Sequence, residues 1–284
     1  TITLDADITA DDILNTAEAT ASVTVTGKVG GDAKAGDTVT LTVNGQNFTG
    51  LVVNNAGVLT FAIAVPGADL LADADKTIAA SITTTDAAGN RATADDSEGY
   101  TVDTAAPSVV VDIVDTSLNS GDKVSTVTFT FSDAPSGFDL TDVTAVGGTL
   151  SGLAVSLTDP KVYTATFTAT DGFTGTGSVS VADASYTDAA GNAGSGNSDT
   201  VPIDTVAPSV VVDIVDASLN SADKVSTVTF TFSDAPVGFT LADTTAVGGT
   251  LSGLTPTADP KVFTATFTAT DGFTGTGSVS VADA

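Results

Sequence analysis

The sequence TAAPSVVVDIVD at residues 104–115 returns as TVAPSVVVDIVD at residues 205–216. The similarity continues, because residues 105–153 align with 206–254 without a gap. After the loss of one residue, 159–184 align with 259–284, and the only difference is Tyr163 against Phe263. Self-similarity at a fixed distance is the signature of a tandem array. The recurring stretch is therefore predicted to mark the boundary between consecutive folding units.

Residues 1–104 form a more distant copy of the same plan. Their last residues, YTVDT, match VPIDT at 201–205 in pattern, and TDAAGN occurs at both 85–90 and 187–192. We therefore expect three repeats, at residues 1–104, 105–204 and 205–284. The third has the subtype of the second and stops before a counterpart of residues 185–204. With Thr as its first residue, the chain is expected to be an excerpt of a longer protein.

Apolar and polar residues alternate with a period of two in most segments. The run VTFTF at 127–131 places Val127, Phe129 and Phe131 on one face and threonines on the other. Such alternation is typical of strands with one buried face, and Asn44-Gly45 is a strong hairpin turn. Short strands separated by frequent turns predict an all-β protein, built as a linear array of tandem immunoglobulin-like β-sandwich domains.

Composition excludes several classes of function. The 35 acidic and 8 basic residues give a formal charge of −27, which repels nucleic acid and anionic membranes. Cys and His are absent, so a zinc site of the usual kind, a Cys nucleophile and a His base are all excluded. No apolar run is long enough to span a bilayer. We expect no enzyme activity, no small-molecule substrate and a monomer that contacts neighbouring repeats of its own chain.

Oxygen-bearing side chains recur at positions 0, +4 and +7 of the first interstrand loop of each repeat. In a sandwich this loop, the following linker and the TDAAGN loop of the next repeat are expected to meet at one joint. Carboxylates brought so close repel one another, and Ca²⁺, which takes six to eight oxygen ligands, relieves that repulsion. The predicted ligands are Asp11, Asp12, Asn15, Glu18, Asp86, Asp103, Asp115, Asn119, Asp122, Asp188, Asn192 and Asp204.

These ligands divide between joints. The joint between the first two repeats is predicted to have all three contributors, namely the first loop, the linker and the TDAAGN loop of the next repeat. Asp86, the counterpart of Asp188, would serve a joint with a preceding unit. Asp204 belongs to the second joint, where a third contributor is missing and the site is expected to be weaker.

Three alternative interpretations stay open. Asp and Asn are also ordinary turn and capping residues, so the same pattern is compatible with a metal-free loop. The threonine rows on the strands are compatible with a carbohydrate- or ice-binding module. A polysaccharide-active enzyme is disfavoured, because the acidic residues lie at turns and many of the aromatic residues fall on inward strand positions.

Several motifs resemble a known family. TLDADITADDILN at 3–15, TDAAGN, and VDTAAP at 102–107 resemble bacterial immunoglobulin-like repeats from giant repeats-in-toxin-type adhesins of Gram-negative bacteria. VTFTFS at 127–132 and GTLSGL at 148–153 resemble a second subtype of these repeats. The resemblance implies an extender region that is exported by type I secretion, held at the extracellular face of the cell, and stiffened by Ca²⁺ at its linkers. Thr116 stands where the first repeat has the second Asp of its pair, so the ligand set of later repeats departs from the pattern.

Overall fold

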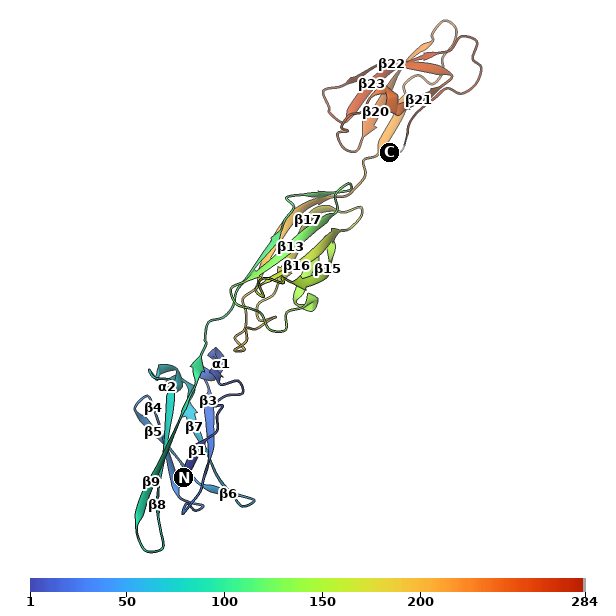
Figure 1. Ribbon diagram of the computed structural model, residues 1–284. Coiled ribbons are helices and arrows are strands. Elements are labelled where there is room, and N and C mark those ends of the chain that lie inside the picture. The colour runs from blue at the N-terminus through green and yellow to red at the C-terminus, as the bar shows by residue number, and fades with distance from the viewer. Residues whose placement is uncertain (283–284) are drawn as a thin grey trace. The chain divides into compact units, whose positions relative to one another are not determined.

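The computed structural model describes residues 1–282, and nearly all of their regular structure is β-strand (Figure 1). Residues 1–205 form one compact unit, and a second unit begins at Val206. The prediction of an all-β protein built from tandem sandwiches is confirmed.

The first repeat contains two four-stranded sheets, ordered β1-β3-β7-β6 and β5-β4-β8-β9, and a two-stranded parallel sheet of β2 and β10. The Asn44-Gly45 turn joins β4 to β5, and both of its residues have positive φ, as that hairpin requires. The elements are β1 (Ile2–Leu4), β2 (Ile13–Leu14), α1 (Thr16–Ala19), β3 (Ser22–Val29), β4 (Thr38–Val43), β5 (Gln46–Leu51), β6 (Val53–Asn55), β7 (Val58–Pro66), α2 (Gly67–Ala72), β8 (Thr77–Thr85), β9 (Arg91–Gly99) and β10 (Thr101–Val102).

The second repeat pairs its strands in the orders β11-β13-β16-β15 and β12-β18-β17-β14. The valine-rich strand β11 lies at the edge of its sheet, as its position just after a proline predicts. The elements are β11 (Val109–Ile113), β12 (Leu118–Asn119), β13 (Val124–Phe131), η1 (Leu140–Asp142), β14 (Val143–Val146), β15 (Gly148–Val155), β16 (Val162–Ala169), β17 (Thr174–Val181) and β18 (Asn197–Asp204).

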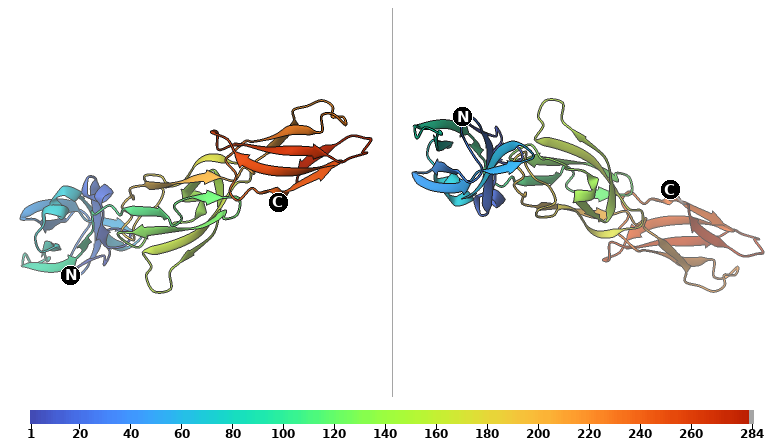
Figure 2. Two further views of the ribbon diagram at one scale, coloured as in Figure 1. Left: turned by 90° about the horizontal axis from the view of Figure 1, so that it is seen from above. Right: turned by 90° about the horizontal axis from the view of Figure 1, so that it is seen from below.

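The third repeat, orange to red in Figure 2, has the sheet β19-β20-β23-β22 and a second sheet that pairs β21 with β24. Its elements are β19 (Val210–Ile214), β20 (Val225–Phe232), η2 (Leu241–Asp243), β21 (Thr244–Val247), β22 (Gly249–Pro256), β23 (Val262–Ala269) and β24 (Ser278–Val281).

Each repeat has its own hydrophobic core. In the first repeat the core joins Val25 of β3 to Leu41 of β4, so it fills the space between the two sheets. Phe129 and Phe167 are completely buried in the second repeat, and Phe230 is completely buried in the third. The alternation of inward apolar and outward threonine side chains confirms the strand prediction.

The helices of residues 1–282 are short, and none combines the length and apolar character needed to cross a membrane.

Candidate functional site

The TDAAGN loops of the first two repeats share one internal geometry. In the loop at 187–192, the Asp188 carboxylate accepts hydrogen bonds from the backbone N–H and the side-chain Nδ2 of Asn192, both at 2.9 Å. In the loop at 85–90, Asp86 accepts the same two bonds from Asn90, at 2.8 and 2.9 Å. The sequence alone therefore fixes the conformation of the loop, because it is the same in two different surroundings.

The surroundings of the two loops differ. Asp188 and Asn192 are 4% and 3% exposed, whereas Asn90 is exposed to solvent and Asp86 is only half-buried. The pKa of Asp86 is lowered, chiefly because the Asn90 side chain donates to the charged carboxylate. The loop at 187–192 is therefore the one that other parts of the protein cover.

A short parallel ladder brings the first loop of the first repeat beside the linker. Thr101 pairs with Ile13 and Val102 pairs with Leu14, where β10 runs along β2. The backbone N–H of Asp103 donates to the Leu14 carbonyl at 3.1 Å. Asn15 and Asp103, which directly follow the two paired strands, therefore lie close together at the same end of this sheet.

Asn15 and Glu18 form a capping box at the start of α1. The Asn15 Oδ1 accepts from the Glu18 N–H at 3.0 Å, and the Glu18 carboxylate accepts from the Asn15 N–H at 3.1 Å. This reciprocal arrangement satisfies backbone donors that the first turn of a helix leaves unpaired. Both side chains were predicted as metal ligands, and in the structure they fulfil the alternative prediction of capping residues.

Asn192 connects the second repeat to the first. Its Oδ1 accepts from the backbone N–H of Thr16 at 2.9 Å, and its Nδ2 donates to the Asp103 carbonyl at 2.9 Å. An asparagine carboxamide offers both donors and an acceptor, so a single side chain binds the helix start and the linker at once. We call this set of contacts the Asn192 latch.

Two further hydrogen bonds support the Asn192 latch. The Asn15 Nδ2 donates to the carbonyl of Ala190 at 2.9 Å, and so the loop and the cap hold each other. Within the first repeat, the Thr16 hydroxyl donates to the Thr104 carbonyl at 3.0 Å and fixes the linker against α1. The joint between the first two repeats is consequently closed by amide and backbone groups.

The Asn192 latch directs an amide N–H, and not an oxygen, at Asp103 and Asp188. Because Oδ1 of Asn192 faces a backbone N–H, its Nδ2 must face the Asp103 carbonyl and the Asp188 carboxylate. Ca²⁺ takes oxygen ligands, and in this arrangement the Asn192 side-chain oxygen is bonded to the Thr16 N–H. The Asp103 carboxylate itself accepts from the Ala105 N–H at 3.0 Å. In residues 1–282 no three acidic side chains are grouped as a metal site, and the predicted ligand set stays a prediction.

The other predicted ligands of the first repeat shape its first loop. Asp11 accepts from the Ile13 N–H at 3.1 Å, and Asp12 accepts from the Ile8 N–H at 3.3 Å with its own φ at 59°. Both are turn interactions of the kind that Asp side chains make.

The corresponding residues of the second repeat also serve their own loop. Asn119 accepts from the N–H groups of Gly121 and Asp122 at 2.9 and 3.1 Å, and the N–H of Asp115 donates to Ser125 at 3.1 Å. Asp204, at the end of β18, accepts from the Thr174 hydroxyl at 2.9 Å.

Two contributors to the joint escaped sequence reasoning. Thr16 and Ala190 take part through backbone atoms, and a pattern of side chains does not predict such contacts. The available signal was the spacing of Asn15 and Glu18, since Asn followed three residues later by Glu is a helix start.

Comparisons with known proteins agree on the kind of repeat. A family model described as a bacterial Ig-like domain matches residues 103–203 and 204–284. A solved structure described as a Ca²⁺-stabilized adhesin that helps an Antarctic bacterium reach out and bind ice is 25% identical, with a TM-score of 0.51. The alignment covers 94% of this chain and 65% of that one, so the chain spans less than two thirds of the adhesin structure.

Two other structures are similar. A bacterial immunoglobulin-like domain from the M. primoryensis ice-binding adhesin is 42% identical over 36% of this chain and 96% of its own, with a TM-score of 0.33. A structure concerned with host cell surface retention of a 1.5-MDa bacterial ice-binding adhesin is 26% identical over 94% of this chain and 86% of its own, with a TM-score of 0.47. No curated protein sequence matches the chain. The resemblance predicted from the motifs is confirmed.

Proposed function

We infer that this chain, which belongs to the bacterial Ig-like domain family, is a spacer segment of a cell-surface adhesin. In this role its repeats hold a ligand-binding region, located elsewhere in the adhesin, away from the cell. Support comes from the tandem arrangement of similar repeats and from the likeness to a Ca²⁺-stabilized adhesin.

The observation that carries this proposal is the Asn192 latch. A side chain only 3% exposed donates to and accepts from the neighbouring repeat. A buried carboxamide that loses such partners leaves unsatisfied groups, which costs about 1–3 kcal/mol. A joint held in this way resists bending, and resistance to bending is the property that a spacer needs.

The proposal places the chain outside the cell, as a monomer without catalytic activity. Its partners are the adjacent repeats of the same polypeptide. A glycan array and an ice-affinity assay on the chain test this role against a binding module. A spacer gives no signal above background in either assay, whereas saturable binding in one of them would assign the chain to recognition.

Calcium binding stays a prediction. It is supported by the charge of −27 and by the likeness to an adhesin described as Ca²⁺-stabilized. An ion that binds only the folded state raises stability by RT ln(1 + [L]/Kd), or about 2.7 kcal/mol at a hundredfold excess over Kd.

A melting experiment tests the calcium prediction. The chain is titrated with CaCl2, and NaCl at matched ionic strength serves as the control for simple screening of the acidic surface. The prediction is a saturable rise in Tm with CaCl2 beyond that seen with NaCl. Equal Tm values at equal ionic strength would remove calcium from the account and leave the spacer role in place.

A further inference from the structure

The third repeat differs from the second although the two sequences match. The octapeptide TGTGSVSV forms all of β17 at 174–181, but at 274–281 only its last four residues form a strand, β24. Leu118–Asn119 form β12, whereas the same two residues at 219–220 are not in a strand. Since local sequence is the same, the cause lies in the surroundings of these segments.

The second repeat has one strand between these segments. There β18 lies between β12 and β17, pairing parallel with the first and antiparallel with the second. Its Val201 and Ile203 point into the core and are 0% and 3% exposed. Residues 205–282 contain no counterpart of this strand.

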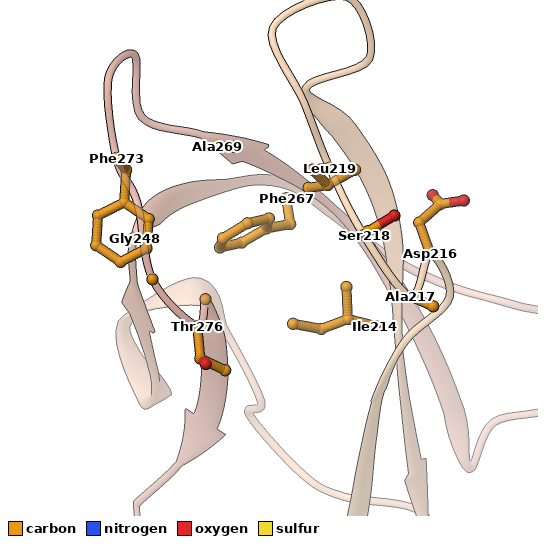
Figure 3. Close-up of a pocket in the computed structure, with 12 residues that line it drawn as sticks. Ile214, Asp216, Ala217, Ser218, Leu219, Gly248, Phe267, Ala269, Phe273 and Thr276 are labelled. Atoms are coloured by element: carbon orange, nitrogen blue, oxygen red, sulfur yellow. The ribbon is translucent and has the colours of Figure 1, made fainter.

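A cavity of about 480 Å³ occupies the corresponding position in the third repeat. Figure 3 shows Phe267 and Ile214 projecting into it between the Leu219 segment on one side and the Phe273–Thr276 segment on the other. A second cavity, of about 360 Å³, shares Leu219, Ala269 and Phe273 with the first. Together they form one groove, which we call the strand groove.

Apolar side chains along the strand groove are more exposed than their counterparts. Leu118 and Val179 are buried in the second repeat, while Leu219 and Val279 are only partly buried. Phe273 reaches 44% exposure. The groove thus combines unpaired backbone edges with apolar surface, which are the two features that an added β-strand satisfies.

We propose that the strand groove binds an extended peptide segment with the pattern of β18, namely Val-x-Ile-Asp-Thr preceded by a second Asp. The Val and Ile side chains pack between Ile214 and Phe267, in the place that Val201 and Ile203 take in the core of the second repeat. The incoming backbone runs parallel to Leu219–Asn220 and antiparallel to residues 274–281, completing the second sheet.

Polar groups at both ends of the segment set its register. In the second repeat the Asp199 carboxylate accepts from the Ile113 N–H at 2.8 Å. At the other end Thr205 accepts from the Phe173 N–H at 2.9 Å and donates to the Thr170 carbonyl at 2.6 Å. In the third repeat the Phe273 N–H bonds to Thr270 instead, at 3.2 Å, and is released when the segment binds.

A labelled synthetic peptide with the sequence of Asn197–Thr205 tests this proposal. Its fluorescence anisotropy is measured against increasing concentrations of the full chain. We expect saturable binding with one peptide per chain, and loss of binding when the peptide carries V201D and I203D, because both charges would be buried against Ile214 and Phe267.

The substitution Gly277→Ala in the chain is expected to block the strand groove to the peptide. At the equivalent Gly177, an added Cβ would lie 2.4 Å from Ile203 Cδ1, so the new methyl group collides with the incoming side chain. Without peptide, the nearest atom to a Cβ at Gly277 is Phe267 Cζ at 3.2 Å, a close but adjustable contact. We expect at least about tenfold weaker binding. Gly99→Ala in the first repeat, with its nearest atom at 3.8 Å, is the control and should bind normally.

Three results would overturn the proposal. They are no saturable binding, equal affinity for the double-Asp peptide, or binding that Gly277→Ala leaves unchanged in a variant with a normal melting curve. A second copy of this chain is the competing occupant of the strand groove, and sedimentation velocity measures whether the chain forms such a dimer. A chain dimer that excludes the peptide would assign the strand groove to self-association instead.

Discussion

At the scale of single residues, Asn192 and Asn90 form a natural comparison. Each donates its backbone and side-chain N–H groups to the aspartate four residues earlier. Only Asn192 also bonds to Thr16 and Asp103 of another repeat. Comparing the same substitution at the two sites therefore measures how much the bonds across the joint contribute to stability.

Asn192→Ala should lower the free energy of unfolding by about 1–3 kcal/mol more than Asn90→Ala. Both substitutions remove the bonds inside the TDAAGN loop, but only the first leaves the Thr16 N–H and the Asp103 carbonyl without partners. Urea denaturation of the two variants measures the difference. Equal losses of stability would show that the cross-joint bonds contribute nothing.

Tyr100 gives a prediction for alkaline pH. It is 5% exposed and its hydroxyl donates to the Leu70 carbonyl at 2.6 Å. Burial, and secondarily the nearby Asp73 carboxylate, raise the pKa of Tyr100 above its usual 10.0. The unfolded chain then loses this proton at a lower pH than the folded chain, so stability is retained below pH 10 and falls as the pH rises beyond it.

The check is the slope of unfolding free energy against pH between about pH 9 and 11, compared with Tyr100→Phe. That variant should lose about 1 kcal/mol at neutral pH, because the hydrogen bond is gone, and should show a shallower alkaline slope. The slope should not vanish, since burial also raises the pKa of Tyr186. Identical slopes would disprove the assignment to Tyr100.

At the scale of elements, neighbours decide how much of a β-pattern becomes a strand. Residues 174–177 belong to β17 because β18 pairs with them from Thr174 to Val181. The same four residues at 274–277 lie outside β24. An alternating sequence thus indicates that a segment can form a strand, and the presence of a partner strand determines how long that strand becomes.

Hydrogen exchange within one sample tests this statement. The amides of residues 275–277 should exchange faster than those of residues 175–177, because only the latter pair with a neighbouring strand, β18. The two segments have the same sequence, so intrinsic exchange rates cancel. Equal protection would mean that the third repeat is ordered there without a partner strand.

Sequence reasoning predicted the strands well because their alternation is produced by burial on one face. Val127, Phe129 and Phe131 are buried as expected. It missed α1, a four-residue helix too short to show a period, although the Asn15 and Glu18 capping pair marks its start.

The position of the joint and several of its residues were predicted from the sequence, but the hydrogen bonds across it were not. Residue type cannot tell whether an Asn side chain presents its oxygen or its nitrogen to a neighbour. For Asn192 that choice is set by the backbone N–H of Thr16, which is 176 residues away in the chain. Such orientation depends on the folded arrangement and is invisible in a pattern of letters.

At the scale of the whole molecule, the account depends on whether the first two repeats keep a fixed relation. A charge of −27 spread over repeats favours separation, since like charges repel within about a Debye length. The Asn192 latch opposes free hinge motion at the point where the chain crosses between repeats. A spacer needs both properties.

The most direct measurement is the distance distribution between spin labels placed on either side of this joint. The chain has no cysteine, so labels at Thr24→Cys and Thr126→Cys, both exposed strand positions, are unambiguous. In the presence of a chelator the account predicts one narrow distribution, broadened by Asn192→Ala and unchanged by Asn90→Ala. A distribution as broad in the parent chain as in Asn192→Ala, or one that narrows only when calcium is added, would contradict it.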